Sequence, residues 1–189
     1  MDYREQIKQQ ITEAAANVVY TYYAHWYLVD RYAKRKKCTM ILEIILMSAT
    51  SVGFLSSLLS FCQYGDLIAS LAAAFSLGLY LYTINIDFNT AIQRHTGAAN
   101  ELWDIREQYR SLLIDFDELD DNEIKSKRDD LTKKVNCINH NYPGTDEKSF
   151  EKARKFIKDN GQSFVEGEAE LVIGIKKIDI ESKNEAENK

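Results

Sequence analysis

Signatures of catalysis and of metal binding are largely missing from this sequence. Its 189 residues include only three cysteines and three histidines. The phosphate-binding, dinucleotide-binding, nucleophile-elbow and metalloprotease motifs are all absent. The histidines (His25, His95 and His140) have no metal-ligand spacing to a cysteine. These absences argue against an enzyme, so we expect no catalytic residues, no metal and no cofactor.

Proline and glycine are also scarce, with one and eight residues respectively. A β-sandwich or barrel needs a turn every 8–12 residues or so, which this supply does not provide. The contents of 45% apolar and 11% aromatic residues argue against a disordered chain. The length suits one domain of about 100–200 residues. These observations favour an all-α protein.

Charge is almost absent from two apolar blocks. Residues 38–62 contain Glu43 as their only charged residue, and residues 67–86 contain none. A helix of about 20 apolar residues spans the hydrocarbon core of a bilayer. The alternative is a buried helix of a soluble domain, but a chain of this size would hardly bury two of them in succession. We predict transmembrane helices over residues 38–62 and 67–87.

The connection over residues 63–66 predicts a tight helical hairpin, and it carries no lysine or arginine. A basic cluster precedes the first span: Arg31, Lys34, Arg35, Lys36 and Lys37. The positive-inside rule then places both termini in the cytoplasm. Nucleic-acid binding is the other interpretation of this cluster. Its position beside a span favours topology and attraction to anionic lipids, at about 1 kcal/mol per residue, so we expect no direct nucleic-acid binding.

The remaining segments predict cytoplasmic helices. Residues 1–37 have helical periodicity and no glycine or proline, so this amphipathic helix is expected to continue into the first span. The expected stripe on it comprises Ile7, Ile11, Ala14 or Ala15, Val18, Tyr22, His25 or Trp26, and Val29. A matching stripe after the second span comprises Leu102, Ile105, Tyr109, Leu112, Leu113 and Phe116. We expect the two stripes to pack together, with His25 as a hydrogen-bonded packing residue.

Residues 88–160 are expected to contain further helices, with a break in the acidic run over residues 115–123. Calcium binding is the other interpretation of that run, but it lacks the glycine and glutamate of an EF-hand loop. Helices are expected over 122–139 and 147–158, with Thr145 or Asp146 capping the second. Residues 161–189 are expected to form a C-terminal segment and tail, in which 171–180 suit a short strand or a partner-binding segment.

Small residues recur at four-residue spacing in both apolar blocks. The first contains Ala49, Gly53 and Ser57, and the second contains Ser70, Ala74 and Gly78. Such spacing lets helices approach closely, either within the hairpin or between copies of the chain. Further serines add polar surface that lipid would not favour: Ser56, Ser60 and Ser76. This pattern favours a homo-oligomer, in which a ring of hairpins encloses a water-filled path.

Glu43 is the one ionisable residue within a span. Snorkelling or pairing with a lysine would explain its position near the cytoplasmic end. The functional interpretation is a ring of carboxylates at the mouth of a pore, which would favour cations.

The order of these parts resembles a known family. The motif Tyr22-Tyr23-Ala24-His25-Trp26 is followed by a basic segment over residues 30–37, two spans, and the motif Ala98-Ala99-Asn100-Glu101-Leu102-Trp103. This layout resembles the SLATT domain, the SMODS and SLOG-associating two-transmembrane effector. The turn Asn141-Tyr142-Pro143-Gly144-Thr145-Asp146, followed by Phe150-Glu151 and Ala153, resembles the family 5 branch.

The resemblance implies an effector of bacterial antiphage defence in the inner membrane. Such proteins are thought to accompany enzymes that make or sense nucleotide signals, or reverse transcriptases, and to form pores that stop growth of the infected cell. It implies a cytoplasmic signal-generating or sensing partner and leaves a nucleotide ligand open. The alternative is a non-enzymatic membrane anchor or scaffold for a cytoplasmic partner. A third interpretation is a constitutive small channel or transporter subunit. The sequence shows no discontinuous helices that would support it.

Overall fold

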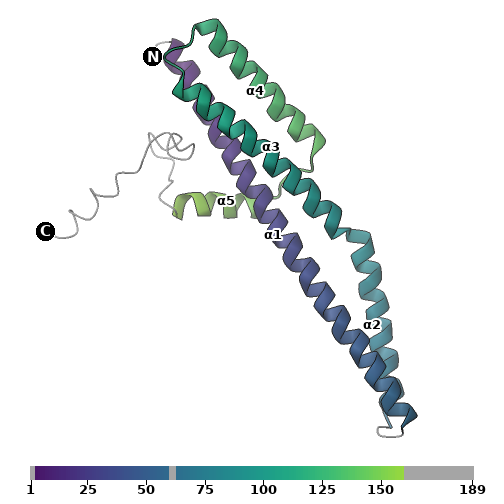
Figure 1. The fold of residues 1–189 in the computed structure, drawn as a ribbon. Helices are drawn as coiled ribbons and strands as arrows, with labels where there is room; N and C mark the ends of the chain where they lie inside the picture. The colour runs from purple at the N-terminus through teal and green to yellow at the C-terminus, as the bar shows by residue number, and fades with distance from the viewer. Residues whose placement is uncertain (1–2, 60–62, 160–189) are drawn as a thin grey trace, which may run out of the picture. The chain divides into compact units, whose positions relative to one another are not determined.

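The computed structural model describes residues 3–59 and 63–159, which form five helices and no strand (Figure 1). The helices are α1 (Tyr3–Leu58), α2 (Gly65–Ile86), α3 (Phe88–Ile114), α4 (Asp121–Asn141) and α5 (Glu147–Asp159). The predicted all-α class is therefore confirmed. The chain divides into two compact units, and each is described by itself. We call Val29–Gln93 the hairpin unit, and Met1–Leu28 with Arg94–Lys189 the helical unit.

Helix α1 continues from the amphipathic segment into the first apolar block, as the sequence predicts. It is 56 residues long. Its first glycine is Gly53, and it contains no proline. Nothing in the sequence therefore interrupts the backbone hydrogen bonds over most of its length.

The core of the helical unit confirms that the two predicted stripes pack together. Its members come from three helices and the α3–α4 loop: Ile7, Ile11, Ala15, Val18, Ala98, Leu102, Ile105, Tyr109, Leu112, Leu113, Phe116, Ile124, Leu131 and Ile138. Of the two alternatives at the end of the first stripe, His25 is 4% exposed and Trp26 is 38% exposed. The periodic apolar residues thus form a three-helix core, and His25 belongs to the buried side.

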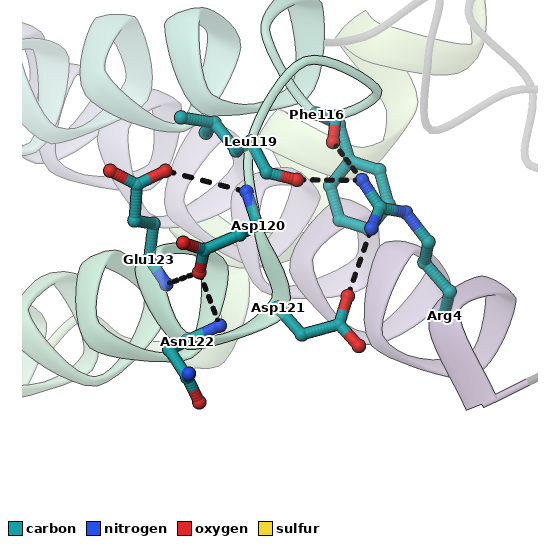
Figure 2. A network of polar contacts seen from close by, with 7 residues as sticks. All are labelled: Arg4, Phe116, Leu119, Asp120, Asp121, Asn122 and Glu123. Carbon is teal, nitrogen blue, oxygen red and sulfur yellow. Dashed lines mark hydrogen bonds and ion pairs between the residues drawn. The ribbon is translucent and has the colours of Figure 1, made fainter.

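The acidic run ends α3 and starts α4, so the predicted helix break is confirmed. Figure 2 shows the Asp120 carboxylate accepting hydrogen bonds from the backbone N–H groups of Asn122 and Glu123, both at 2.8 Å. The Glu123 carboxylate accepts from the Asp120 N–H at 3.3 Å, which completes a capping box. The carboxylates of Asp120 and Glu123 therefore serve the start of α4.

Arg4 holds this loop against α1. Its guanidinium donates to the carbonyl oxygens of Phe116 and Leu119, both at 2.8 Å, and to the carboxylate of Asp121 at 2.9 Å (Figure 2). It also lies 5.3 Å from the centroid of the Phe116 ring. A single planar cation thus satisfies two loop carbonyls that no helix can pair.

The turn between α4 and α5 is anchored by Tyr142. A Cβ atom on Gly97 would lie 3.0 Å from the Tyr142 ring. The phenol donates to the Glu101 carboxylate at 2.6 Å, and this hydrogen bond raises the pKa of Tyr142. After the turn, Asp146 accepts from the Ser149 N–H at 2.8 Å, so of the two predicted caps of α5, Thr145 and Asp146, the structure shows Asp146.

Helix α5 packs on a second face of α1 through aromatic side chains. The Tyr20 and Phe150 ring centroids are 5.8 Å apart, and those of Tyr23 and Phe156 are 5.2 Å apart. Ile157 is fully buried in a small cluster with Val19 and Tyr20. The first half of α1 therefore carries apolar contacts on two faces.

The hairpin unit has its apolar residues on the outside. The most apolar windows of its two helices are only 6% and 11% buried. A core helix of a soluble domain would be mostly buried, so the two helices have the length, composition and exposure of membrane spans. Helix α2 begins two residues before the predicted span, and Asp87, at φ 41°, separates it from α3.

Candidate functional site

A seam with a 3.5-residue period joins the two helices of the hairpin unit. On α2, the buried and half-buried positions alternate in steps of four and three: Gly65, Ala69, Ala72, Ser76, Leu79, Thr83 and Ile86. This spacing is typical of helices that pack at a shallow left-handed crossing angle. The corresponding positions on α1 are Glu43, Leu46, Ala49, Thr50, Gly53 and Ser56. Small and hydroxyl-bearing residues therefore form much of the seam.

Gly53 is the point of closest approach in the hairpin. A Cβ atom at this position would lie 3.0 Å from the Gly65 carbonyl oxygen and 3.1 Å from the Ala69 nitrogen. Both neighbours are backbone atoms, which cannot move aside without opening the hairpin. The local geometry of α1 and α2 thus requires glycine at residue 53.

The predicted small residues of α2 lie on its other side. Ser70, Ala74 and Gly78 are all exposed, and a Cβ atom on Gly78 would meet nothing within 4 Å. At about 100° per residue they lie opposite the seam. We call these three residues the back face of α2. Ser60 lies outside the described residues, and the side chain of Ser57 is not described.

A groove runs along one side of the seam and contains Glu43. The inner part, on the side of the hairpin loop, has a volume of about 520 Å³. It is lined by Glu43, Met47, Thr50, Ser51, Ala73, Ser76, Leu77 and Tyr80. The outer part, about 450 Å³, is lined by Lys36, Thr39, Met40, Glu43, Thr83, Ile84, Asp87, Phe88 and Asn89. We call the two together the hairpin groove. Glu43 lines both parts and therefore lies where they adjoin.

Glu43 makes no hydrogen bond or ion pair to any residue that the structure describes. Pairing with a lysine was the structural explanation for Glu43, and no such pair is seen in residues 3–59 and 63–159. An ionisable group in a span is a strong indication of a functional position, because lipid does not solvate it.

The basic cluster before the first span is solvated and partly paired. Lys34 forms an ion pair with Asp30 at 2.6 Å, one helical turn away. Lys36 donates to the Asn89 amide oxygen at 2.7 Å. Arg35 and Lys37 are exposed, and Arg31 is half-buried. These positions suit charges that flank a span.

A buried histidine pair lies within the helical unit. The Nδ1 atoms of His25 and His95 are 2.9 Å apart, and each residue is 4% exposed. Desolvation, reinforced by His95, lowers the pKa of His25 from its ordinary value of 6.5 to about 4. One ring donates and the other accepts, and the lowered pKa keeps His25 neutral at pH 7. The prediction that His25 is a hydrogen-bonded packing residue is confirmed.

Exposed aromatic side chains cover part of the helical unit. Tyr22 lies between Trp26 and Trp103, with centroid distances of 6.4 Å and 5.2 Å. The Arg106 guanidinium lies 4.5 Å from the Trp103 ring centroid. Trp103 is 41% exposed despite its size. Tryptophan, tyrosine and arginine are the residues that most often anchor protein–protein interfaces.

No cluster of three or more potential metal ligands occurs in the described part of the chain. The fold and the hairpin define the class as an all-α membrane protein with two spanning helices. The sequence model of the SMODS and SLOG-associating 2TM effector domain family 4 matches residues 7–168. The chain therefore belongs to the SLATT family and is a membrane effector of defence systems. No curated protein and no solved structure matches it.

The match corrects the predicted branch from family 5 to family 4. The prediction depended on the turn over residues 141–146 and on Phe150, Glu151 and Ala153. The structure shows that the turn connects α4 to α5 and caps α5 through Asp146. Such chemistry is common to many connections between helices, so it does not distinguish one branch from another.

Proposed function

We propose that copies of this chain assemble in the membrane through the back face of α2 and permeabilise the bilayer. The observation that carries this proposal is the division of small residues between two faces. Gly53 is already in contact with α2, whereas Ser70, Ala74 and Gly78 are exposed, and a Cβ atom on Gly78 would meet nothing within 4 Å. Small residues let helices approach closely, and lipid offers no hydrophobic driving force to replace such packing.

The orientation of the proposed assembly follows from the basic cluster. Arg31, Lys34, Arg35, Lys36 and Lys37 precede the first span, and the hairpin loop has no such charge. We therefore place both termini in the cytoplasm, in the inner membrane of a bacterium. The helical unit would then meet a cytoplasmic partner that makes or senses the activating signal.

Membrane potential tests the proposal directly. Controlled expression in bacteria, with a voltage-sensitive dye and growth followed together, should show depolarisation before growth arrest, alone or with the genomic neighbour and phage challenge. Gly78→Leu should abolish depolarisation while the protein still inserts, because residue 78 is exposed and a Cβ atom there meets nothing of its own hairpin within 4 Å. Gly78→Ala is the matched control and should retain activity.

Gly53→Leu separates hairpin folding from assembly. This change should lower the level of inserted protein as well as activity, because it opens the hairpin itself. Full depolarisation with Gly78→Leu would contradict assembly through the back face.

The exposed aromatic residues favour a second function, a membrane anchor for a cytoplasmic partner. Trp26 and Trp103 would form the docking surface. Under this alternative, growth arrest occurs without depolarisation, Trp103→Ala abolishes it, and Gly78→Leu has no effect.

A further inference from the structure

The hairpin groove presents oxygen atoms as hydrogen-bond acceptors. Four groove hydroxyl groups donate to carbonyl oxygens of their own helix: Thr39 to Lys36 at 2.9 Å, Thr50 to Leu46 at 2.9 Å, Ser51 to Met47 at 3.1 Å, and Thr83 to Tyr80 at 2.9 Å. A carbonyl oxygen only accepts, so the hydrogen of each hydroxyl is already used. The lone pairs of these hydroxyl oxygens remain for a ligand in the groove.

Two of the three charged residues that line the groove are carboxylates. The Glu43 carboxylate has no partner among the described residues, and Asp87 lies at the outer end, where it accepts from the Thr90 N–H at 3.1 Å. The one cation, Lys36, donates to the Asn89 amide oxygen. An anion would therefore meet a single ammonium group, whereas a cation meets two carboxylates and several hydroxyl oxygens.

We propose that the hairpin groove is the path of monovalent cations and that Glu43 determines their selection over anions. This inference rests on the proposed permeabilising function. Carboxylate and hydroxyl oxygens can replace the hydration shell of a hard cation. A negative charge at a low-dielectric wall also raises the local concentration of cations.

The groove and the back face are separate surfaces of the same hairpin. Ala73 and Tyr80 line the groove, whereas Ala74 and Gly78 lie on the back face. Around α2, the two surfaces differ by about a third of a turn. A neighbouring copy seated on the back face would therefore leave the groove open toward the axis of a ring.

The lining suits monovalent rather than divalent ions. A calcium site takes six to eight oxygen ligands, usually with several carboxylates around one ion. The described residues contain no cluster of three or more acidic, histidine or cysteine ligands. Glu43 is the one carboxylate at the junction of the two parts.

Reversal potentials in a potassium chloride gradient test this inference with the purified full-length chain in planar bilayers. The parent chain should pass potassium in preference to chloride. Glu43→Gln should lower the potassium-to-chloride permeability ratio about tenfold, because one unit charge is lost beside the path. Glu43→Asp should retain most of the ratio. Asp66→Asn removes an exposed carboxylate in the first turn of α2 and should change nothing.

Two further variants give a signature that a loss of folding would not produce. Lys36→Gln should raise the permeability ratio, because it removes the one cation of the groove. Ser51→Ala should lower potassium conductance, whereas Ser48→Ala should not. The Ser48 hydroxyl makes the same kind of bond, to the Ile44 carbonyl at 2.8 Å, but it does not line the groove.

The outcomes separate this inference from the proposed function. Conductance that prefers chloride, or a ratio unchanged by Glu43→Gln, overturns the cation path and leaves permeabilisation standing. No conductance from cross-linked oligomers of the parent chain overturns both. A cation preference that falls with Glu43→Gln and rises with Lys36→Gln supports the inference.

Discussion

The two units of this protein use isoleucine in opposite ways. Ile11 in the helical unit is fully buried, whereas Ile68 in the hairpin unit is 50% exposed. The helical unit excludes water by packing apolar side chains against one another, so its stability depends on their shape. The hairpin unit directs its apolar side chains outward to lipid, and its helices meet through small residues. The two units of one chain thus keep apolar surface away from water in different ways, one by packing it in a core and the other by facing it to lipid.

The largest expected effect comes from truncating the same residue type in each unit. Ile11→Ala should lower the free energy of unfolding by about 2–5 kcal/mol, because it leaves a cavity in a close-packed core. Ile68→Ala should have little effect, since lipid or detergent fills the space. Thermal unfolding in detergent measures both. Equal losses would mean that the two units bury apolar surface in the same way.

Acid should act mainly on the helical unit, through the histidine pair. The native pKa of His25, about 4, lies below its ordinary value of 6.5. Between these values the unfolded chain binds a proton that the native chain does not, so stability is full above pH 6.5 and falls toward pH 4. The loss should reach about 3 kcal/mol at most, at 1.36 kcal/mol per pKa unit.

Unfolding measured from pH 7.5 to pH 4 tests the role of the histidine pair. His25→Gln should flatten the dependence on pH in this window. His140→Gln is the matched control, because His140 is exposed, and it should leave the slope unchanged. A slope that survives His25→Gln would assign the acid sensitivity to other groups.

The smallest expected effect concerns how helices begin in the two units. Helix α4 starts with the Asp120 capping box, whereas α2 starts after Tyr64, which makes no side-chain cap. Asp120→Ala should lower the free energy of unfolding by about 1 kcal/mol. Asp117→Ala is the control from the same acidic run, since its side chain is 83% exposed and 3.8 Å from Lys8. Equal effects of the two changes would argue against the cap.

Much of the fold could be predicted because local signals agreed with the final structure. The charge-free blocks, the absence of helix breakers before Gly53, and the acidic break before α4 each depend on residues close together in the chain. The cap by Asp146 belongs to the same class. The site was harder to predict. Four-residue spacing identified Ser70, Ala74 and Gly78, whereas the seam of α2 follows the 3.5-residue pattern of Gly65, Ala69, Ala72 and Ser76.

That seam had a signal in the sequence, since small residues at alternating spacings of four and three indicate a shallow left-handed crossing. The histidine pair had none, because His25 and His95 are 70 residues apart. The hydrogen bonds of Arg4 are equally non-local, because their acceptors, Phe116 and Leu119, lie more than a hundred residues along the chain. Such contacts depend on how the elements pack.

The sequence by itself determined the class of this protein: two helices long and apolar enough to span a membrane, and two periodic apolar stripes that pack against each other. Hydropathy and helical period are properties of neighbouring residues, so they can be seen without a structure. Tertiary structure alone decided that Gly53 lies against the backbone of α2 and that Glu43 lies in a groove lined by hydroxyl-bearing residues. These features depend on the rotation of one helix against another, which side-chain packing determines and local sequence does not.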